Sequence, residues 1–266
     1  MNKIRLYKNW KRLHEPFLES LSGCEILMLF SGGKDSSAAL DLLIEAAVEF
    51  DFEPAVHAGA YPVHRYPFEE RKRISDYWSE RGIEIQWHEP APDDSAIENT
   101  QDPCGACQGI RKRMLASFLE KRDSQWDKLV IVTSYSLWDL VSYSMEQILG
   151  GLLAPGENTG ERFRETAQRF FPVLHMKEGY KVFKPLVTIN ATEIQEHLEN
   201  QGIPTLDKEC RFNSLRPKRI LENYYKTSGL TFDYRKLLDF AQKSLSLPSP
   251  SSYEFIDRDE YLGRLF

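Results

Sequence analysis

Hydrophobic residues follow two patterns along the chain, one typical of strands and one typical of helices, and segments of the two kinds alternate. Short apolar or alternating runs predict strands at 26–30, 54–61, 83–87, 129–133, 173–174 and 180–183. Apolar residues three and four positions apart predict helices at 36–50, 68–81, 107–122, 139–149, 162–171, 192–200, 217–225 and 233–244. Strands that alternate with helices predict an α/β fold with a doubly wound parallel sheet, which binds ligands at the carboxyl ends of its strands.

The two ends of the chain differ in pattern from its middle. Residues 1–25 alternate basic and apolar positions, which predicts a helix that covers the domain. Residues 206–266 hold two further helices, a Ser/Pro-rich segment and an aromatic tail. The sequence therefore predicts an N-terminal helical segment, an α/β domain over 26–205 and a C-terminal helical extension with a tail.

Composition and charge narrow the class of protein. The chain has 266 residues, of which 41% are hydrophobic and 28% charged, as is typical of a soluble globular protein. It lacks both a run of roughly 18 apolar residues and the apolar core of a signal peptide, so we expect a cytoplasmic protein with no membrane contact. The net charge of −6 gives no global attraction to nucleic acid, but residues 208–226 hold six basic and two acidic residues, which permits a polyanionic partner.

The turn between the first strand and the first helix is rich in small residues. Gly32 and Gly33 allow backbone angles closed to other residues and let a ligand approach the main chain. Ser31, Ser36 and Ser37 add hydroxyl donors at the positive end of the helix. The spacing matches neither a Walker A loop nor GxGxxG. The turn is nevertheless suited to hold pyrophosphate.

An acidic residue inside this anion-binding turn indicates a further role. Asp35 is best explained if it holds a metal or a substrate hydroxyl beside the phosphates. The stretch Ser31-Gly32-Gly33-Lys34-Asp35-Ser36 resembles the SGGxDS signature of the PP-loop ATP pyrophosphatases, which have an adenine nucleotide alpha-hydrolase-like fold. Members of that superfamily cleave ATP between the α and β phosphates and adenylate a substrate oxygen.

The resemblance implies a set of ATP-binding and catalytic residues. Pyrophosphate would bind at Ser31, Gly32, Gly33, Asp35, Ser36 and Ser37. Mg²⁺ would bridge the phosphates and a carboxylate, with Asp35 the first candidate and Asp139 the second. The backbone at Ala58 and Gly59 would lie against the adenosine, and Lys34 or Lys184 would stabilise charge that develops on the phosphates.

The four cysteines fall at positions 24, 104, 107 and 210. Cys104 and Cys107 form a CxxC pair, which favours a metal or redox site over a disulfide in a chain with no secretory signal. Zinc usually takes four ligands, commonly as two pairs, whereas this chain has one pair. Cys24 precedes the first strand at its amino end, away from the ligand edge, and Cys210 could fold back to the pair.

The order of phosphate loop, CxxC pair with an Arg-rich helix and distant single cysteine resembles the iron-sulfur tRNA thiolation branch of the superfamily, the 2-thiocytidine synthetase type. That branch holds a 4Fe-4S cluster by three cysteines, and the free iron carries the sulfur. The resemblance implies Cys104, Cys107 and Cys210 as ligands and Arg111 as a phosphate contact near the cluster. The Gly-His-x-x-Asp-Asp segment of the branch is replaced at 134–139, where only Asp139 remains.

The resulting hypothesis is an ATP pyrophosphatase that adenylates a nucleic acid and supports sulfur insertion. The substrate would be tRNA, or DNA as in the similar PP-loop proteins of DNA phosphorothioation. The sulfur donor would be a protein such as a cysteine desulfurase, and the assembly a homodimer or a multi-protein modification complex. Two alternatives stay open: an amide- or nitrile-forming ligase of the same superfamily with zinc on the cysteines, and a non-catalytic ATP-binding subunit.

Overall fold

A computed structural model describes most of the chain. The described residues are 3–59, 66–89, 95–120, 126–149, 168–206, 210–215, 217–245 and 247. The predicted loop at 152–160, the predicted helix at 162–171 up to residue 167 and the aromatic tail lie outside them.

One six-stranded sheet forms the centre of the molecule. Its strands are β1 (Glu25–Phe30), β2 (Pro54–Gly59), β3 (Ile85–His88), β4 (Leu129–Val132), β5 (Val173–His175) and β6 (Lys181–Phe183). They lie in the order β3-β2-β1-β4-β6-β5. All neighbouring strands are parallel except β5 and β6, which form an antiparallel hairpin at the edge. The predicted doubly wound α/β fold is confirmed, with one antiparallel strand added.

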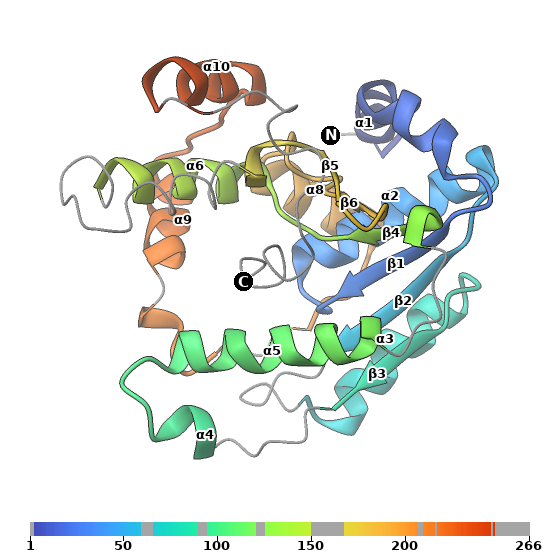
Figure 1. Cartoon of the computed structure of the whole chain (residues 1–266), viewed down its shortest axis with the longest axis horizontal. Helices are drawn as coiled ribbons and strands as arrows, with labels where there is room; N and C mark the ends of the chain where they lie inside the picture. Colours follow the sequence, from blue (N-terminus) through green and yellow to red (C-terminus); the bar gives the residue numbers. More distant parts are fainter. Residues whose placement is uncertain are drawn as a thin grey trace.

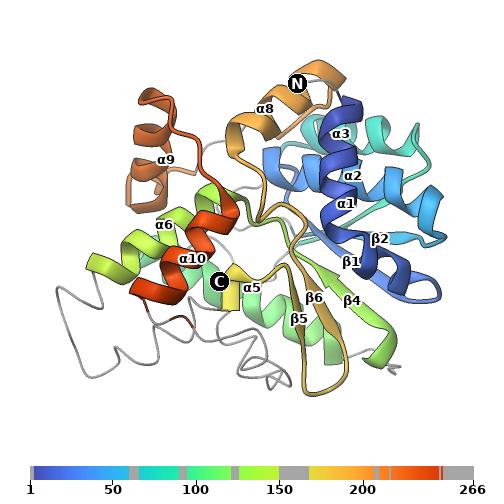
Figure 2. The same ribbon diagram turned by 90° about the horizontal axis from the view of Figure 1, so that it is seen from above.

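Helices cover both faces of this sheet. They are α1 (Lys3–Leu18), α2 (Lys34–Phe50), α3 (Phe68–Ser79), α4 (Ser95–Glu98), α5 (Pro103–Glu120), α6 (Leu137–Gln147), α8 (Ala191–Gln201), α9 (Pro217–Thr227) and α10 (Tyr234–Ser244). Short 3₁₀ turns lie at Glu19–Leu21, Trp126–Lys128, Gln168–Phe170 and Asn213–Leu215. Helices α1, α2, α3 and α8 lie on one side of the sheet, and α5, α6, α9 and α10 lie on the other (Figure 2).

The apolar strands are buried on both faces because of this arrangement. Ile26, Met28 and Phe30 of β1 pack into the core shared with α1, α2, α3 and α8. Leu27, between them, packs into the opposite core with Leu115 of α5. Successive strand residues point to opposite faces, so β1 reads as a continuous apolar run and not as an alternating one.

Several helices begin earlier than the sequence predicted, and hydrogen bonds at their ends explain the difference. Helix α6 begins at Leu137, not 139, because Ser136 and Asp139 form a capping box. Helix α5 begins at Pro103, not 107, since Asp102 accepts a hydrogen bond from the backbone N–H of Gly105 at 2.9 Å. Residues 103–106, outside the predicted helix, therefore belong to α5, and the CxxC pair lies inside its first turns. Helix α8 begins at Ala191, not 192, with Asn190 as its N-cap in a capping box with Glu193.

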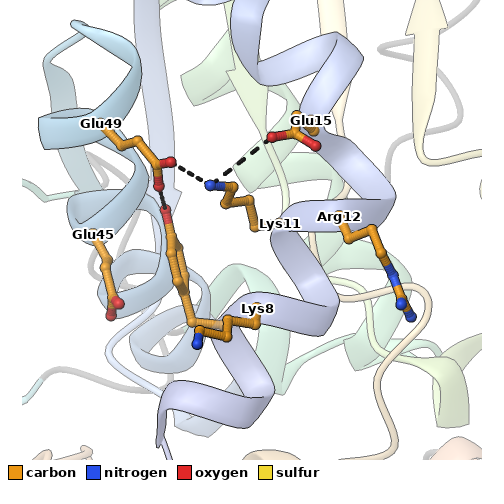
Figure 3. A pocket seen from close by; sticks show the side chains of 7 residues that line it. Lys8, Lys11, Arg12, Glu15, Glu45 and Glu49 are labelled. Atoms are coloured by element: carbon orange, nitrogen blue, oxygen red, sulfur yellow. Dashed lines mark hydrogen bonds and ion pairs between the residues drawn. The ribbon is translucent and has the colours of Figure 1, made fainter.

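Helix α1 covers the domain as predicted, by packing on β6 and α2. Trp10 Nε1 donates a hydrogen bond to the backbone oxygen of Pro185 at 2.8 Å. The ring of His14 meets Phe183 edge-on, with 5.2 Å between the ring centres. On the α2 side, a charged surface hollow of about 280 Å³ separates the two helices. Figure 3 shows Lys11 between Glu15 and Glu49 in this hollow, so its charges largely neutralise one another.

No described helix combines length and apolar character in the way that crossing a membrane requires.

The buried imidazole of His14 should make stability depend on pH. Burial lowers the pKa of His14 to about 4, from 6.5 in an unfolded chain. The unfolded protein therefore binds a proton on this imidazole near pH 6.5, whereas the folded protein binds one only near pH 4. Stability is complete above pH 6.5 and falls as the pH drops toward 4, by roughly 3 kcal/mol in total.

Urea unfolding at pH 7 and pH 5 measures this effect. The wild type should lose roughly 2 kcal/mol between the two values, and His14→Gln should lose clearly less. His175→Gln, at an exposed position on β5, is the control and should behave as the wild type. A His14→Gln variant with the same loss as the wild type would contradict the assignment.

Candidate functional site

The turn after β1 is closed by hydrogen bonds between its own serines. Ser36 Oγ donates to the backbone oxygen of Gly33 at 3.0 Å and accepts from the backbone N–H of Ser31 at 3.2 Å. The hydroxyl oxygens of Ser31 and Ser36 are 3.0 Å apart. Gly33 is the N-cap residue of α2, which begins at Lys34. The turn is therefore formed in advance of any ligand, at the carboxyl end of a central strand.

Only one of the two glycines in the turn needs a glycine conformation. Gly32 has a φ of +72°, whereas Gly33 has a φ of −79°. The backbone oxygen of Gly32 accepts a hydrogen bond from the N–H of Leu206 at 2.7 Å, and a Cβ on Gly32 would overlap the Leu206 side chain. Leu206, in the segment after α8, thus packs against Gly32 and fixes the conformation of the turn.

Three helices begin beside this turn. Asp35 lies in the first turn of α2, Asp139 in the first turn of α6, and Lys218 is the second residue of α9. Lys218 Nζ forms an ion pair with Asp139 Oδ1 and lies 3.5 Å from Glu222 Oε1. Figure 1 shows α6 and α9 next to each other, on the side toward which β1 points. The positive ends of three helix dipoles therefore meet at one place, an arrangement that favours an anion.

The carboxylates of Asp35 and Asp139 differ in their hydrogen-bond partners and in the direction of their pKa shifts. Asp139 Oδ2 accepts from the backbone N–H and the hydroxyl of Ser136 at 2.9 and 2.8 Å, and Oδ1 is taken by Lys218. Burial would raise the pKa of Asp139, but Lys218 and Ser136 outweigh it and hold the pKa below its usual value. The pKa of Asp35 is raised to about 6, mainly by burial and further by the nearby Asp139, although Lys34 opposes the rise.

One carboxylate oxygen of Asp35 lacks a hydrogen-bond partner in the described part of the chain. This atom, Oδ1, is also buried. The same holds for the hydroxyls of Ser37, Thr133 and Ser134, which lie in the first turn of α2 and directly after the neighbouring strand β4. Buried polar atoms are normally satisfied, so this set fits a site that a polar ligand completes. A Mg²⁺ ion at Asp35 would remove the cost of burying its charge.

The predicted adenosine-binding residues end the strand beside β1. Ala58 is fully buried, and Gly59 pairs with His88 across β2 and β3. His57 Nδ1 and His88 Nε2 are 2.9 Å apart at this edge. Residues 60–65, which follow, lie outside the described part of the chain.

Lys184 lies at the same sheet edge but engages a different group from the one predicted. Its Nζ donates to the backbone oxygen of Phe171 at 2.9 Å, and only 1% of the residue is exposed. Burial, and then Arg169, lower the pKa of Lys184 well below its usual value. Lys34, by contrast, lies 5.4 Å from the centre of the Trp138 ring, next to Asp139.

The predicted cluster ligands come from two segments. Cys104 and Cys107 are half-buried in the first turns of α5, and Arg111 lies one turn further on the same face. Cys210 is also half-buried, and the adjacent Arg211 forms an ion pair with Glu98 of α4, which packs on α5.

These cysteines match an iron-sulfur cluster in kind, because cysteine thiolates are the usual ligands of such clusters. Their arrangement is not that of a formed site: within the described ranges no three His, Cys, Asp or Glu side chains are grouped to hold a metal.

Lys218 and Glu222 were missed by the sequence analysis. Both belong to α9, in the segment predicted as a C-terminal extension, and Lys218 had been noted only as one of a run of basic residues. The signal that could have found it is its position directly after Pro217, at the start of a helix, where a basic residue opposes the helix dipole and so needs an acidic partner.

Among the comparisons with known proteins, one solved structure supports the fold. No protein-family model matches the chain, and no curated protein sequence matches it. Among solved structures, the chain is similar to the U34-tRNA thiolase NcsA from Methanococcus maripaludis with its 4Fe-4S cluster, at a TM-score of 0.61 and 17% identity over 91% of this chain and 81% of that one. It also matches NMN synthetase from Francisella tularensis, at a TM-score of 0.47 and 13% identity over 88% and 92% of the two chains. The second likeness is too loose to carry an argument.

In metal-free protein, substitution of Asp35 and substitution of Asp139 should change the free energy of unfolding in opposite directions. The pKa of Asp35 is about 6 when folded and 3.8 when unfolded, so its ionised form costs stability as the pH rises from 4 to 6 and beyond. Asp35→Asn should therefore raise the free energy of unfolding at pH 8 by roughly 1–3 kcal/mol, with little gain at pH 4. Asp139→Asn should lower it by roughly 3 kcal/mol, because Lys218 loses its buried partner. Urea unfolding with EDTA measures both, and an Asp35→Asn variant that is less stable at pH 8 would refute the assignment.

Gly32→Ala should destabilise the protein for two separable reasons. The left-handed backbone costs an alanine roughly 1–2 kcal/mol, and the overlap with Leu206 adds to it. Gly82→Ala is the matched control, because Gly82 has a φ of +79° with open space around it. Chemical denaturation should show a larger loss for Gly32→Ala than for Gly82→Ala, and the difference should shrink in a Leu206→Ala background. Equal losses would mean that Leu206 does not confine the turn.

Proposed function

We propose that this chain, which has the α/β fold of the PP-loop proteins, is an ATP-using enzyme that activates tRNA for sulfur insertion. The observation that carries the proposal is the meeting of three helix N-termini around the unsatisfied carboxyl group of Asp35, directly after a turn of the SGGxDS type. The positive ends of three helix dipoles favour the phosphate chain of a nucleotide, and the unsatisfied carboxylate of Asp35 suits its Mg²⁺.

In this proposal the turn binds the phosphates through its backbone and hydroxyl groups. Gly32 and Gly33 let phosphate oxygens approach the main chain, and the free N–H groups of the first turn of α2 point at them. The hydroxyls of Ser31 and Ser36 can turn from their present partners toward a ligand, and the hydroxyl of Ser37 has no partner among the described residues. The backbone of Ala58 and Gly59, at the end of the adjacent strand, lies against the adenosine.

Asp35 and Asp139 have different roles in the proposed site. Asp35 holds Mg²⁺, which neutralises phosphate charge when it is bound. Asp139 has no free oxygen, since Ser136 and Lys218 occupy both. We therefore assign to Asp139 the positioning of α6 and α9, in place of a metal contact. Lys34, at the first residue of α2, stabilises charge on the departing pyrophosphate.

The proposed chemistry is adenylation followed by displacement. An oxygen of the tRNA base attacks the α phosphorus of ATP, the bond to the bridging α–β oxygen breaks, and pyrophosphate leaves. A sulfur nucleophile then attacks the activated base carbon, and AMP departs with the former base oxygen. The tRNA assignment takes its support from the likeness to the tRNA thiolase NcsA and from the basic residues of α9.

Cys104, Cys107 and Cys210 would hold a 4Fe-4S cluster, which would supply an iron atom able to bind the incoming sulfur. The support for this part is the thiol chemistry of the three residues and the cluster of the NcsA neighbour. Adenylation itself does not depend on the cluster. Arg111, on the same face of α5, would contact phosphate near it.

The test is a reaction of anaerobically purified protein with ATP, Mg²⁺, sulfide and tRNA. We expect tRNA-dependent pyrophosphate release and a thiolated nucleoside detectable by mass spectrometry. Asp35→Ala should abolish both. Cys104→Ser should lose bound iron and thiolation while it keeps pyrophosphate release, and Cys24→Ser, at the amino end of β1, should resemble the wild type.

Three results would overturn parts of this proposal. Full pyrophosphate release by Asp35→Ala would remove the assigned role of that residue. Thiolation of DNA but not of tRNA would replace the substrate. Zinc in place of iron, with an amide or nitrile product, would favour a ligase.

A further inference from the structure

We propose that Lys218 of α9 binds the phosphate chain of ATP directly, so that the C-terminal helix completes the nucleotide site. This inference rests on the proposed function, because it assigns a contact to the same ATP molecule. It goes beyond that function by giving a segment outside the SGGxDS turn a part in substrate binding.

The position of Lys218 is set by acidic residues that are more buried than the lysine itself. The side chain of Lys218 is 24% exposed, whereas those of Asp139 and Glu222 are 2% and 7% exposed. Lys218 is therefore the most exposed of these three side chains. Asp139 is in turn fixed by Ser136, so the lysine is held by a rigid partner.

The ammonium group retains capacity for another acceptor. A lysine has three N–H donors, and Lys218 directs them toward Asp139 at ion-pair distance and toward Glu222 at 3.5 Å. Glu222 is shared with Arg219, whose Nη1 donates to it at 2.7 Å, so Glu222 is not neutralised by Lys218 alone. An ammonium group can bridge a carboxylate and a phosphate oxygen with these donors.

The location agrees with a phosphate contact. Asp139 and Asp35 belong to the first turns of α6 and α2, and Lys218 lies in the first turn of α9, which packs on α6. The lysine therefore stands where the positive ends of these helices meet, next to the turn that follows β1. Lys34, the cation of the turn itself, lies 5.4 Å from the centre of the Trp138 ring, so both cations stand beside the first turn of α6.

The competing explanation is that Lys218 only joins α6 to α9 and contacts no ligand. The two explanations predict different affinities for ligands with and without phosphates. Calorimetry with the non-hydrolysable analogue α,β-methylene-ATP and with adenosine, both in Mg²⁺, measures the phosphate contribution. For Lys218→Met we expect a roughly 10- to 100-fold loss of affinity for the analogue, as for one hydrogen bond to a charged group, with adenosine affinity unchanged. Lys218→Arg, which keeps the charge, should recover part of the loss.

Lys226→Met is the matched control, because Lys226 is an exposed lysine near the other end of the same helix. It should bind both ligands as the wild type does. If Lys218→Met does not fold, the charge-balanced double variant Lys218→Met/Glu222→Met replaces it, with Glu222→Met as its reference. Equal affinity for the analogue with and without Lys218, or a parallel loss of both ligands, would overturn the inference. A wild-type protein that binds no ATP analogue at all would instead overturn the proposed function.

Discussion

The buried carboxylate of Asp139 is the point at which distant parts of this chain are joined. One of its oxygens closes the capping box of α6 and the other takes the ammonium group of Lys218 from α9. A carboxylate that is only 1% exposed is tolerated because both partners are present. The pairing joins the first turns of α6 and α9 close to Asp35 in the first turn of α2, and Leu206 hydrogen-bonds to the turn after β1. Asp35 is buried beside both members of this pair, with Lys34 also near and with one oxygen left without a partner among the described residues.

Features that depend on residues close in sequence could be predicted. The apolar run of β1, the glycine turn and the amphipathic pattern of α2 are local signals, and the structure has strand, turn and helix in that order. The predicted helix over 192–200 is local in the same way, since its N-cap Asn190 and the capping partner Glu193 are three residues apart. The family resemblance of the turn rested on six consecutive residues, and the fold agrees with it.

Features that depend on contacts between distant residues could not be predicted. The ion pair of Lys218 with Asp139 and the hydrogen bond of Leu206 to Gly32 join segments far apart in the chain, and no local pattern marks either one. The start of α5 was misplaced because Pro103 and Gly105 are typical of loops. Proline is in fact tolerated in the first turn of a helix, and Gly105 leaves the space that the capping Asp102 occupies. The roles of the cysteines stay a prediction, as two segments of the chain must approach each other to join them.

A structure of the protein with α,β-methylene-ATP and Mg²⁺ would test the central claim most directly. The account predicts that the triphosphate lies between the first turns of α2, α6 and α9, with a metal ion on Asp35 and a phosphate oxygen within hydrogen-bond distance of Lys218. A nucleotide bound elsewhere on the molecule, with these three helix ends free of phosphate, would contradict it.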